Sequence, residues 1–472
     1  MIGVKRQTAK YIICDYVMSN IAWLLFNIIR FYMPVVASGY VVLSDFLLSR
    51  NVLIGQLFMP LIMMAVYYLS GYYNIVFFKS RLQELFTTIS SVAFNTLLLY
   101  FTALINDVLP LRSDNYELIF ILFALQFVCI YSLRLIITTN ATHKIHNREW
   151  YFNTLVIGCG SQALKLTKEL NERTKSLGYN IVGYVDIKEG SLSKDLPYPI
   201  YPNQDLEKLC NDLNIKYIIV AVDDNRQVHL NAVINELYPL DRPIKMQSTV
   251  FHNLIGRVKL SNIYGQPFVD VSSCAISPSG RNMKRLIDII VSAIALVFVS
   301  PIIALFAILI KRDSKGPVFY SQERIGYHHK PFHIYKLRTM YTDAESNGTP
   351  QLSSADDSRI TPIGKYMRKY RIDELPQFWN ILKGDMSLVG PRPEREFFIK
   401  QIIKKAPYYA LMYQIRPGLT SWGMVKYGYA QNVDEMVERL QYDIVYLENM
   451  SMLVDLKIII HTVRTVFTGK GM

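Results

Sequence analysis

The sequence predicts a membrane α-helical bundle, then a Rossmann-like α/β domain, then a re-entrant membrane helix-hairpin joined to an α/β domain with candidate catalytic residues. Four long apolar segments open the chain, strands and helices alternate from about Tyr151, and a fifth apolar segment is interrupted by Ser300 and Pro301. At 472 residues, the chain exceeds the length at which one core keeps growing, so several domains are expected. We place them at residues 1–145, 150–272, 281–312 and 313–472.

The chain is strongly basic and its cysteines are scattered. Lysine and arginine number 51 against 38 acidic residues, a net charge of +13. In a membrane protein this excess indicates cytoplasmic loops and anionic lipid head groups before nucleic acid, so we expect membrane lipids and no nucleic acid as partners. The five cysteines form no Cys-x-x-Cys pair, which argues against a zinc site or a disulfide framework and fits a reducing cytoplasm.

Each of the four N-terminal apolar segments has close to the ~20 residues that a helix needs to cross a bilayer. They run from Tyr11 to Ile29, from Val52 to Ser70, from Leu85 to Ile105 and from Leu118 to Thr138. Positive residues gather on one flank, at Lys5, Arg6, Lys10, Lys79, Arg81, Lys144 and Arg148, while Arg50 and Arg112 stand nearly alone on the other. The positive-inside rule therefore predicts that both ends of the bundle are cytoplasmic. Asp15 and Asn95 inside these segments are either functional or bridge neighbouring helices, and we favour bridging.

From about Tyr151 the pattern changes to alternating strands and helices. Residues 154–163 predict a buried strand, a glycine turn and a helix start, and further strands are expected at Ile181–Asp186 and Tyr217–Val222. The glycine pattern is incomplete, Gly158-x-Gly160-x-x-Ala163, with Asp186 where an acid that binds a ribose would stand. A bound nucleotide is one interpretation. We favour a structural, regulatory or assembly domain whose glycines only form the turn.

The fifth apolar segment, Leu286 to Ile310, is long enough to span a membrane, but positive charges flank both of its ends. Neither end therefore prefers the outside. Pro301 removes a backbone donor and bends a helix, and Ser300 can satisfy a backbone group that the proline frees. We predict a hairpin break at Ser300 and Pro301, with the segment entering and leaving the membrane on one side. A straight fifth span is the alternative and would place the C-terminal part outside the cell.

Residues 313–472 combine adjacent carboxylates with many cations. Segments 321–326 and 332–340 predict a β-hairpin that presents Arg324, Lys336 and Arg338. Residues 363–371 predict a basic helix that leads into Asp373 and Glu374. Guanidinium groups match phosphate oxygens in pairs and lysine supplies a compact charge, so these cations would lower the cost of a diphosphate beside the carboxylates. The alternative is a solvated basic face.

Five motifs occur in order: Lys336-Leu-Arg-Thr-Met340, Asp357-Ser-Arg-Ile-Thr361, Asp373-Glu-Leu-Pro-Gln377, Lys383-Gly-Asp-Met-Ser-Leu-Val-Gly-Pro-Arg-Pro393 and Arg416-Pro-Gly-Leu-Thr420. With them, residues 281–472 resemble the bacterial sugar transferase family, the monotopic polyprenyl-phosphate hexose-1-phosphate transferases, or phosphoglycosyl transferases. The four-helix bundle and the Rossmann-like domain resemble the long, exopolysaccharide-initiating branch of that family.

The resemblance implies transfer of a sugar 1-phosphate from a UDP-sugar to undecaprenyl phosphate, with release of UMP, at the cytoplasmic face of the bacterial inner membrane. It implies that Asp373 attacks the sugar-linked phosphorus, forming a phosphosugar-aspartyl intermediate, and that Glu374 binds Mg²⁺. Covalent catalysis suits two anionic phosphates, one soluble and one lipid-borne, because they never need to meet. Adjacent residues on an α-helix point about 100° apart, so one carboxylate can face phosphorus while the other faces the metal.

The resemblance also implies substrate-binding roles for Lys336, Arg338, Arg368, Arg392, Arg416 and Asp443. Asp443 is alternatively a solvated residue on an amphipathic helix. Long members of the family suggest a homodimer. One departure is Ser421, which stands where the family commonly has glycine; if that position needs a positive φ, serine there is strained.

Two other functions compete with this interpretation. A membrane-anchored nucleotide-sugar dehydratase or epimerase would also combine helices with a Rossmann-like domain, but it usually needs a helical Tyr-x-x-x-Lys pair. Tyr184 and Lys188 have that spacing and fall at a predicted strand end. A non-catalytic polysaccharide assembly protein would not need the intact Asp373-Glu374 pair. The sequence does not identify the sugar.

Overall fold

The computed structural model describes residues 4–33, 41–74, 76–77, 79, 81–104, 112–186, 195–222, 236–240, 242–247, 268–270, 276–342, 344, 357–428 and 430–467. The chain divides into two compact units. The first comprises Met1–Phe152, Leu170–Tyr179 and Ser277–Met283, and the second comprises Asn153–Glu169, Asn180–Ile276 and Lys284–Met472. Ile105 and Lys188, named above, lie outside the described residues.

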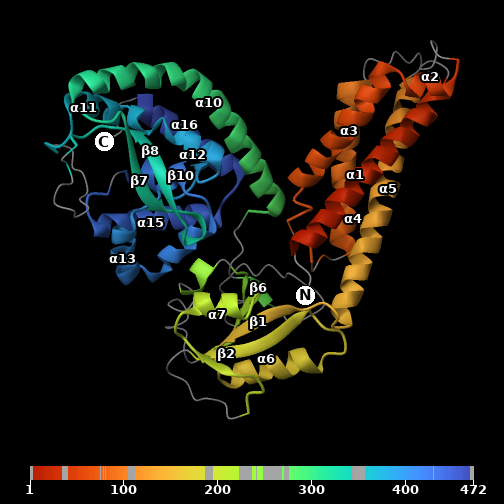
Figure 1. Ribbon diagram of the computed structural model, residues 1–472, viewed down its shortest axis with the longest axis horizontal. Helices are drawn as coiled ribbons and strands as arrows, with labels where there is room; N and C mark the ends of the chain where they lie inside the picture. The colour runs from red at the N-terminus through yellow and green to blue at the C-terminus, as the bar shows by residue number, and fades with distance from the viewer. Residues whose placement is uncertain are drawn as a thin grey trace. The chain divides into compact units, whose positions relative to one another are not determined.

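Four apolar helices of the first unit run side by side in Figure 1: α1 (Val4–Phe31), α3 (Arg50–Leu69), α4 (Arg81–Leu99) and α5 (Arg112–His146). The short α2 (Leu43–Leu47) and the π-helical η1 (Tyr100–Leu104) complete this part. Within the described residues, five helices are long and apolar enough to cross a membrane, these four and α10 (Pro278–Asp313). Large apolar side chains such as Leu57, Phe94 and Phe120 are exposed, as a lipid environment favours. The predicted segments are thus confirmed as helices, and they indicate a membrane protein.

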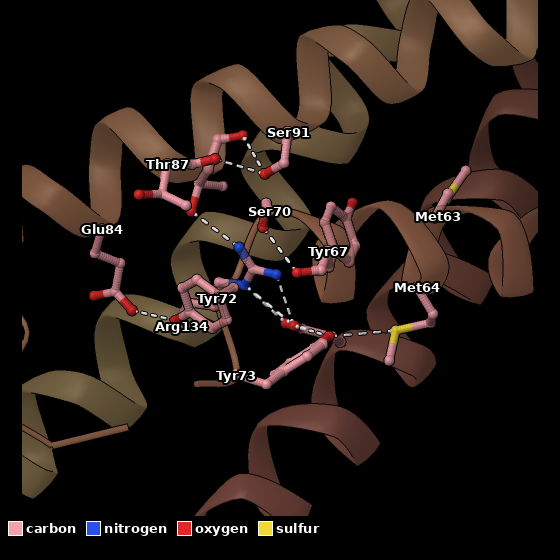
Figure 2. Close-up of polar contacts among 12 residues, drawn as sticks. Met63, Met64, Tyr67, Ser70, Tyr72, Tyr73, Glu84, Thr87, Ser91 and Arg134 are labelled. Carbon is pink, nitrogen blue, oxygen red and sulfur yellow. Dashed lines mark hydrogen bonds and ion pairs between the residues drawn. The ribbon is translucent and has the colours of Figure 1, made fainter. Parts of the chain in front are cut away.

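A cluster of charged and polar side chains lies inside this helix bundle (Figure 2). Arg134 of α5 donates to both carboxylate oxygens of Asp15 in α1, at 3.0 Å from Nε and 2.7 Å from Nη2. Its guanidinium lies 4.6 Å and 3.6 Å from the ring centroids of Tyr67 and Tyr72. Tyr73 donates its hydroxyl to Asp15 at 2.7 Å. Asp15 therefore bridges helices, in line with the favoured interpretation, and a buried charge needs such partners to be tolerated.

Asn95 has a similar bridging contact. Its side-chain nitrogen, on α4, donates to the carbonyl oxygen of Met63 on α3 at 3.4 Å. Polar side chains that reach a neighbouring helix hold transmembrane helices together, because lipid offers them no other partner.

A six-stranded sheet lies mainly in the second unit and has the order β3-β2-β1-β4-β5-β6. Its elements are β1 (Phe152–Ile157), α6 (Ser161–Glu172), β2 (Tyr179–Asp186), β3 (Ile200–Pro202), α7 (Leu206–Asp212), β4 (Tyr217–Val220), η3 (Tyr238–Leu240), β5 (Ile244–Gln247) and β6 (Phe268–Asp270). β1, β4 and β5 pair in parallel, as do β2 and β3, whereas β6 is antiparallel to β5. Gly158 has φ +116°, and a Cβ there would lie 2.3 Å from the carbonyl oxygen of Ala221, so only glycine fits. The predicted strands and glycine turn are confirmed.

α10 is one continuous helix with Pro301 inside it. Figure 1 shows it bending between its two ends. Pro301 cannot donate to the carbonyl of Val297 four residues earlier, and the Ser300 hydroxyl donates to that carbonyl at 3.0 Å instead. The helix is therefore continuous across Ser300 and Pro301, with a bend and a satisfied carbonyl in place of the predicted hairpin break. Re-entry into the membrane stays a prediction.

The rest of the second unit is built from short elements. They are β7 (Phe319–Ile325), η4 (Tyr327–His329), β8 (Pro331–Leu337), α11 (Pro362–Lys369), η5 (Ile372–Glu374), α12 (Gln377–Lys383), β9 (Ser387–Val389), α13 (Glu396–Lys405), η6 (Pro407–Gln414), β10 (Gly418–Thr420), α14 (Trp422–Lys426), α15 (Val433–Glu448) and α16 (Met452–Phe467). β7 and β8 form the predicted antiparallel hairpin, and β9 pairs with β10 in parallel. Phe306 and Ile310 of α10 pack with Leu337 and Met367 in a small core that Ile372 joins. This packing sets α10 against the segment that carries Asp373.

Replacing Arg134 by alanine should lower the free energy of unfolding by roughly 3–5 kcal/mol, because Asp15 would be left as an uncompensated buried charge. Thermal unfolding in detergent measures this loss. Arg81→Ala removes an exposed arginine from the same bundle and should change little. The pair Asp15→Ala with Arg134→Ala should cost less than the sum of its single variants. An Arg134→Ala protein that melts like Arg81→Ala would contradict this account.

Candidate active site

The adjacent carboxylates lie on a single 3₁₀ turn, η5. α11 begins at Pro362, where the Thr361 hydroxyl accepts a hydrogen bond from Gly364 N at 3.0 Å. After α11, Arg371 adopts left-handed backbone angles, φ 53° and ψ 27°, and turns the chain into η5. Because a 3₁₀-helix has 3.0 residues per turn, Asp373 and Glu374 diverge by about 120° and not by the α-helical angle expected from the sequence. The two side chains can still face different groups.

Glu374 is the meeting point of three cations. Lys336 Nζ lies 2.8 Å and Arg392 Nη1 3.6 Å from Glu374 Oε1, and Arg371 Nη1 lies 3.3 Å from Oε2. Burial alone would raise the pKa of this carboxyl, but the three cations outweigh it and hold the pKa well below its usual range. Glu374 therefore stays ionised and fixed in place.

Asp373 differs from its neighbour because no hydrogen bond or ion pair to its carboxylate is present within the described residues. It is also buried, with 8% of its surface exposed. Burial raises the pKa of Asp373 to about 6, although Lys336 opposes the rise. At neutral pH the group is thus a carboxylate without a bonded partner, which is the state that a nucleophile requires.

Three of the predicted phosphate-binding arginines differ in how they interact with this pair. Arg368 acts electrostatically on Asp373, and its Nε donates to Thr339 Oγ1 at 2.9 Å. Arg392 contacts Glu374 directly, as given above. Arg416 donates from Nε to the carbonyl oxygen of Gly384 at 2.9 Å, which fixes the turn after α12. The structure therefore gathers Lys336, Arg368 and Arg392 around the carboxylates, and a substrate-binding role for Arg416 stays a prediction.

Arg338 makes contacts of a structural kind. Its Nη1 donates to the carbonyl oxygen of Lys315 at 2.7 Å and its Nη2 to that of Ser314 at 2.8 Å. These carbonyls directly follow the C-terminal end of α10, where helices leave acceptors unpaired. Arg338 thus anchors the end of α10, and its role toward substrate stays a prediction.

Asp443 is buried on α15, with 4% of its surface exposed. Its Oδ1 accepts a hydrogen bond from Gly423 N at 2.9 Å, which holds the start of α14. The alternative of a solvated residue is therefore wrong, because the packing of α14 covers this side chain. Its role as a substrate contact stays a prediction.

Ser421 does not have the strained backbone that a positive φ would cause. Its backbone is extended, with φ −136° and ψ 160°, and its hydroxyl accepts a hydrogen bond from Met424 N at 2.9 Å. Serine is a preferred residue at the position that begins a helix. The departure from glycine therefore supplies a helix cap.

Two contributions to the site were not among the sequence-predicted site residues. Arg371 stands at the end of the predicted basic helix 363–371, and its position three residues before Glu374 is the signal that could have identified it. Glu394 follows the Pro-Arg-Pro turn and pairs with Arg324 at 3.3 Å and with Arg439 at 2.6 Å. This ion-pair group fixes the turn that carries Arg392.

Asp373 and Glu374 could supply the carboxylate ligands of a Mg²⁺ ion. Within the described residues, no group of three or more His, Cys, Asp or Glu side chains is arranged to hold a metal ion. Mg²⁺ commonly takes one or two carboxylates, with water and substrate phosphates completing its octahedron. Asp373 and Glu374 offer those carboxylate oxygens.

Replacing Asp443 by asparagine should alter how stability depends on pH. Burial raises the pKa of Asp443 from 3.8 to about 6, so the native state holds this proton more tightly than the unfolded state. The stability that the proton contributes is fully present below about pH 4 and is lost as the pH rises through about 6. Asp443→Asn cannot titrate at this position, so it lacks this loss of stability. From pH 4 to pH 7, the free energy of unfolding of the variant should therefore rise relative to that of wild type by up to about 3 kcal/mol.

Chemical unfolding in detergent at four pH values measures this difference. Glu448→Gln removes an exposed carboxylate from the same helix and serves as the control. Stability curves of Asp443→Asn and wild type that run parallel across this pH range would contradict the assignment.

The sequence is similar to several known proteins. The family described as bacterial sugar transferase matches residues 279–469. A UDP-N-acetylgalactosamine-undecaprenyl-phosphate N-acetylgalactosaminephosphotransferase of Aeromonas hydrophila is 34% identical over 290 residues, covering 58% of this chain and 68% of that protein. A UDP-glucose:undecaprenyl-phosphate glucose-1-phosphate transferase of Klebsiella pneumoniae is 32% identical over 300 residues, covering 62% and 63%. An uncharacterized sugar transferase of Bacillus subtilis (strain 168) is 39% identical over 190 residues, covering 40% of this chain and 89% of that protein.

Sequence identity and the share of each chain that is matched determine whether these similarities establish a family. Among solved structures, UDP-D-quinovosamine 4-dehydrogenase from Vibrio fischeri is 19% identical over 26% of this chain and 93% of that chain, with a TM-score of 0.21, too low to bear on the fold. The Aeromonas relative, by contrast, is more than 30% identical and is covered over more than two thirds of its length. The family match also spans the whole segment that carries the five motifs and both carboxylates. The chain therefore belongs to the bacterial sugar transferase family.

Proposed function

We propose that the protein transfers a sugar 1-phosphate from a UDP-sugar to undecaprenyl phosphate at the cytoplasmic face of the bacterial inner membrane, releasing UMP and initiating polysaccharide or glycoconjugate synthesis. The observation that carries the proposal is the buried Asp373 carboxylate, which has no bonded partner among the described residues and lies beside the fixed Glu374. The names of the relatives from Aeromonas and Klebsiella support the two substrate classes.

The chemistry would proceed in two displacements at one phosphorus. In the first, an Asp373 oxygen attacks the sugar-linked phosphorus, a new P–O bond forms, and the bond to UMP breaks with its electron pair leaving on UMP. In the second, a phosphate oxygen of undecaprenyl phosphate attacks the same phosphorus and displaces Asp373. The products are a lipid diphosphate sugar and the free carboxylate.

The cations around the pair suit the charge that this reaction handles. Lys336 and Arg392 already lie within 4 Å of a carboxylate oxygen and are positioned to meet phosphate oxygens as well. Arg368 lies near Asp373 and adds a further donor. Glu374, with Asp373 beside it, would hold Mg²⁺, which when bound offsets charge on the diphosphate and on the departing UMP.

The membrane helix supports a location at the bilayer surface. Val297 and Phe298 of α10 are about three-quarters exposed, at 70% and 74%, so lipid is their natural surrounding. α10 also packs through Phe306 and Ile310 onto the core that Ile372 joins. A reaction centre so close to a lipid-facing helix is suited to one soluble and one lipid-borne substrate. The cytoplasmic orientation rests on the positive residues around the helix ends.

The competing functions have less support. In a dehydratase or epimerase, Tyr184 would have to reach a substrate, but it is fully buried in β2 and its hydroxyl pairs with Thr167 Oγ1 at 2.7 Å. A non-catalytic assembly protein would give no reason to keep Asp373 unbonded and Glu374 held by three cations. A homodimer, expected from long members of the family, remains a proposal.

Replacing Asp373 by asparagine should reduce UMP release by at least about 10³-fold, because an amide oxygen cannot carry the covalent phosphosugar. Purified protein, undecaprenyl phosphate, Mg²⁺ and a panel of UDP-sugars form the assay. Incubation with a UDP-sugar labelled at the sugar-linked phosphorus, without lipid, should label wild type and leave Asp373→Asn unlabelled. The exposed Asp434→Asn on α15 is the control. If Asp373→Asn released UMP at a rate close to that of wild type, the covalent mechanism would be ruled out.

Removal of divalent ions should stop the reaction, because the diphosphate charge would be left without its metal. EDTA should abolish UMP release and added Mg²⁺ should restore it. Glu374→Gln should require roughly tenfold or more Mg²⁺ for half-maximal rate, since one carboxylate ligand is lost. Full activity in EDTA would rule out the metal.

A further inference from the structure

The carboxylate pair is surrounded by more positive than negative charge. Lys336, Arg371 and Arg392 act on Glu374, and Arg368 acts on Asp373, so four cations face two carboxylates and these six groups sum to 4 − 2 = +2. We propose that this surplus excludes free Mg²⁺ from Glu374 until the diphosphate of the nucleotide sugar is bound, and that Arg371 sets the strength of this coupling. The inference rests on the proposed function and adds a binding order to it.

The contacts of Glu374 carry the first step of the argument. Both of its oxygens are engaged by cations, Oε1 by Lys336 at 2.8 Å and Oε2 by Arg371 at 3.3 Å. A divalent ion arriving at either oxygen would lie next to at least one of these charges. Glu374 is only 5% exposed, and water screens charges poorly at such a buried site. A free ion would therefore meet net repulsion.

A bound diphosphate would neutralise this surplus charge. The diphosphate of a nucleotide sugar brings two negative charges, which reduce the sum for the site from +2 to zero. The cations then have phosphate oxygens to contact, and Glu374 can offer an oxygen to the metal. Coupling between two ligands is reciprocal, so Mg²⁺ should raise the affinity for the nucleotide by the same factor.

Arg371 is the cation best suited to set this coupling. It pairs with Glu374 Oε2 and lies three residues before it, whereas Lys336 and Arg392 share Oε1. It was also not among the expected substrate contacts. Its φ of 53° is one that asparagine tolerates, so Arg371→Asn removes the charge without adding backbone strain.

Mg²⁺ titrations followed by thermal unfolding of the full chain in detergent test the proposal, without and with UDP and at corrected free Mg²⁺ concentrations. For wild type, UDP should lower the apparent Kd for Mg²⁺ at least about tenfold. In Arg371→Asn, Mg²⁺ alone should bind more tightly, and the coupling factor should fall severalfold. Arg371→Lys keeps the charge and should keep the coupling. Lys365→Gln removes an exposed charge from α11 and should behave like wild type.

Two results would overturn the inference: an Mg²⁺ affinity of wild type that UDP does not change, although UDP itself stabilises the protein, or full coupling in Arg371→Asn. If Arg371 had only a structural role, Arg371→Asn would have a lower melting temperature and an unchanged coupling factor. That result would also contradict the inference. Absence of any stabilisation by UDP would instead count against the proposed function. Equal affinities of wild type and Arg371→Asn for Mg²⁺ alone would then still overturn the inference.

Discussion

The ion pairs of Glu374 are the contact on which the candidate site depends. They join three separate parts of the chain, since Lys336 comes from β8, Arg371 from the turn before η5, and Arg392 from the Pro-Arg-Pro turn. A buried charge is stable only when such partners are present, so the three parts must assemble together for any one of them to be placed. Asp373 gains from this arrangement because its neighbour, and not Asp373 itself, binds the cations.

In the helix bundle too, a buried charge is stable only with a partner, here among helices suited to a lipid environment. Asp15 and Arg134 are far apart in sequence and fully enclosed, and each satisfies the other. The surrounding tyrosine rings supply further favourable contact with the guanidinium. Ionic pairing thus fixes the mutual positions of α1 and α5 where apolar side chains alone would allow them to slide.

Much of the fold and the central pair of the site could be predicted from the sequence. Apolar length located the helices, and the ordered motifs located Asp373 and Glu374, because both signals are local. The left-handed backbone of Arg371, the burial of Asp443 and the carbonyl contacts of Arg338 could not be predicted. Each depends on which distant segment packs against the residue, and a single sequence carries no direct record of that. Ser421 is a further example. The missing glycine suggested strain, but Ser421 has an extended backbone and caps α14, which the sequence did not reveal.

The hydrogen bond from Ser300 to the carbonyl of Val297 has a consequence for how the bend of α10 arises. Donor and acceptor lie within one helical turn of Pro301, so the bend needs no contact from the rest of the protein to satisfy its backbone. Its shape is thus a local property of a few adjacent residues. A synthetic peptide spanning Pro278–Asp313 in a lipid micelle has everything required to adopt the same curvature. The bend can also form as the chain is synthesised, before the residues that follow α10 have folded.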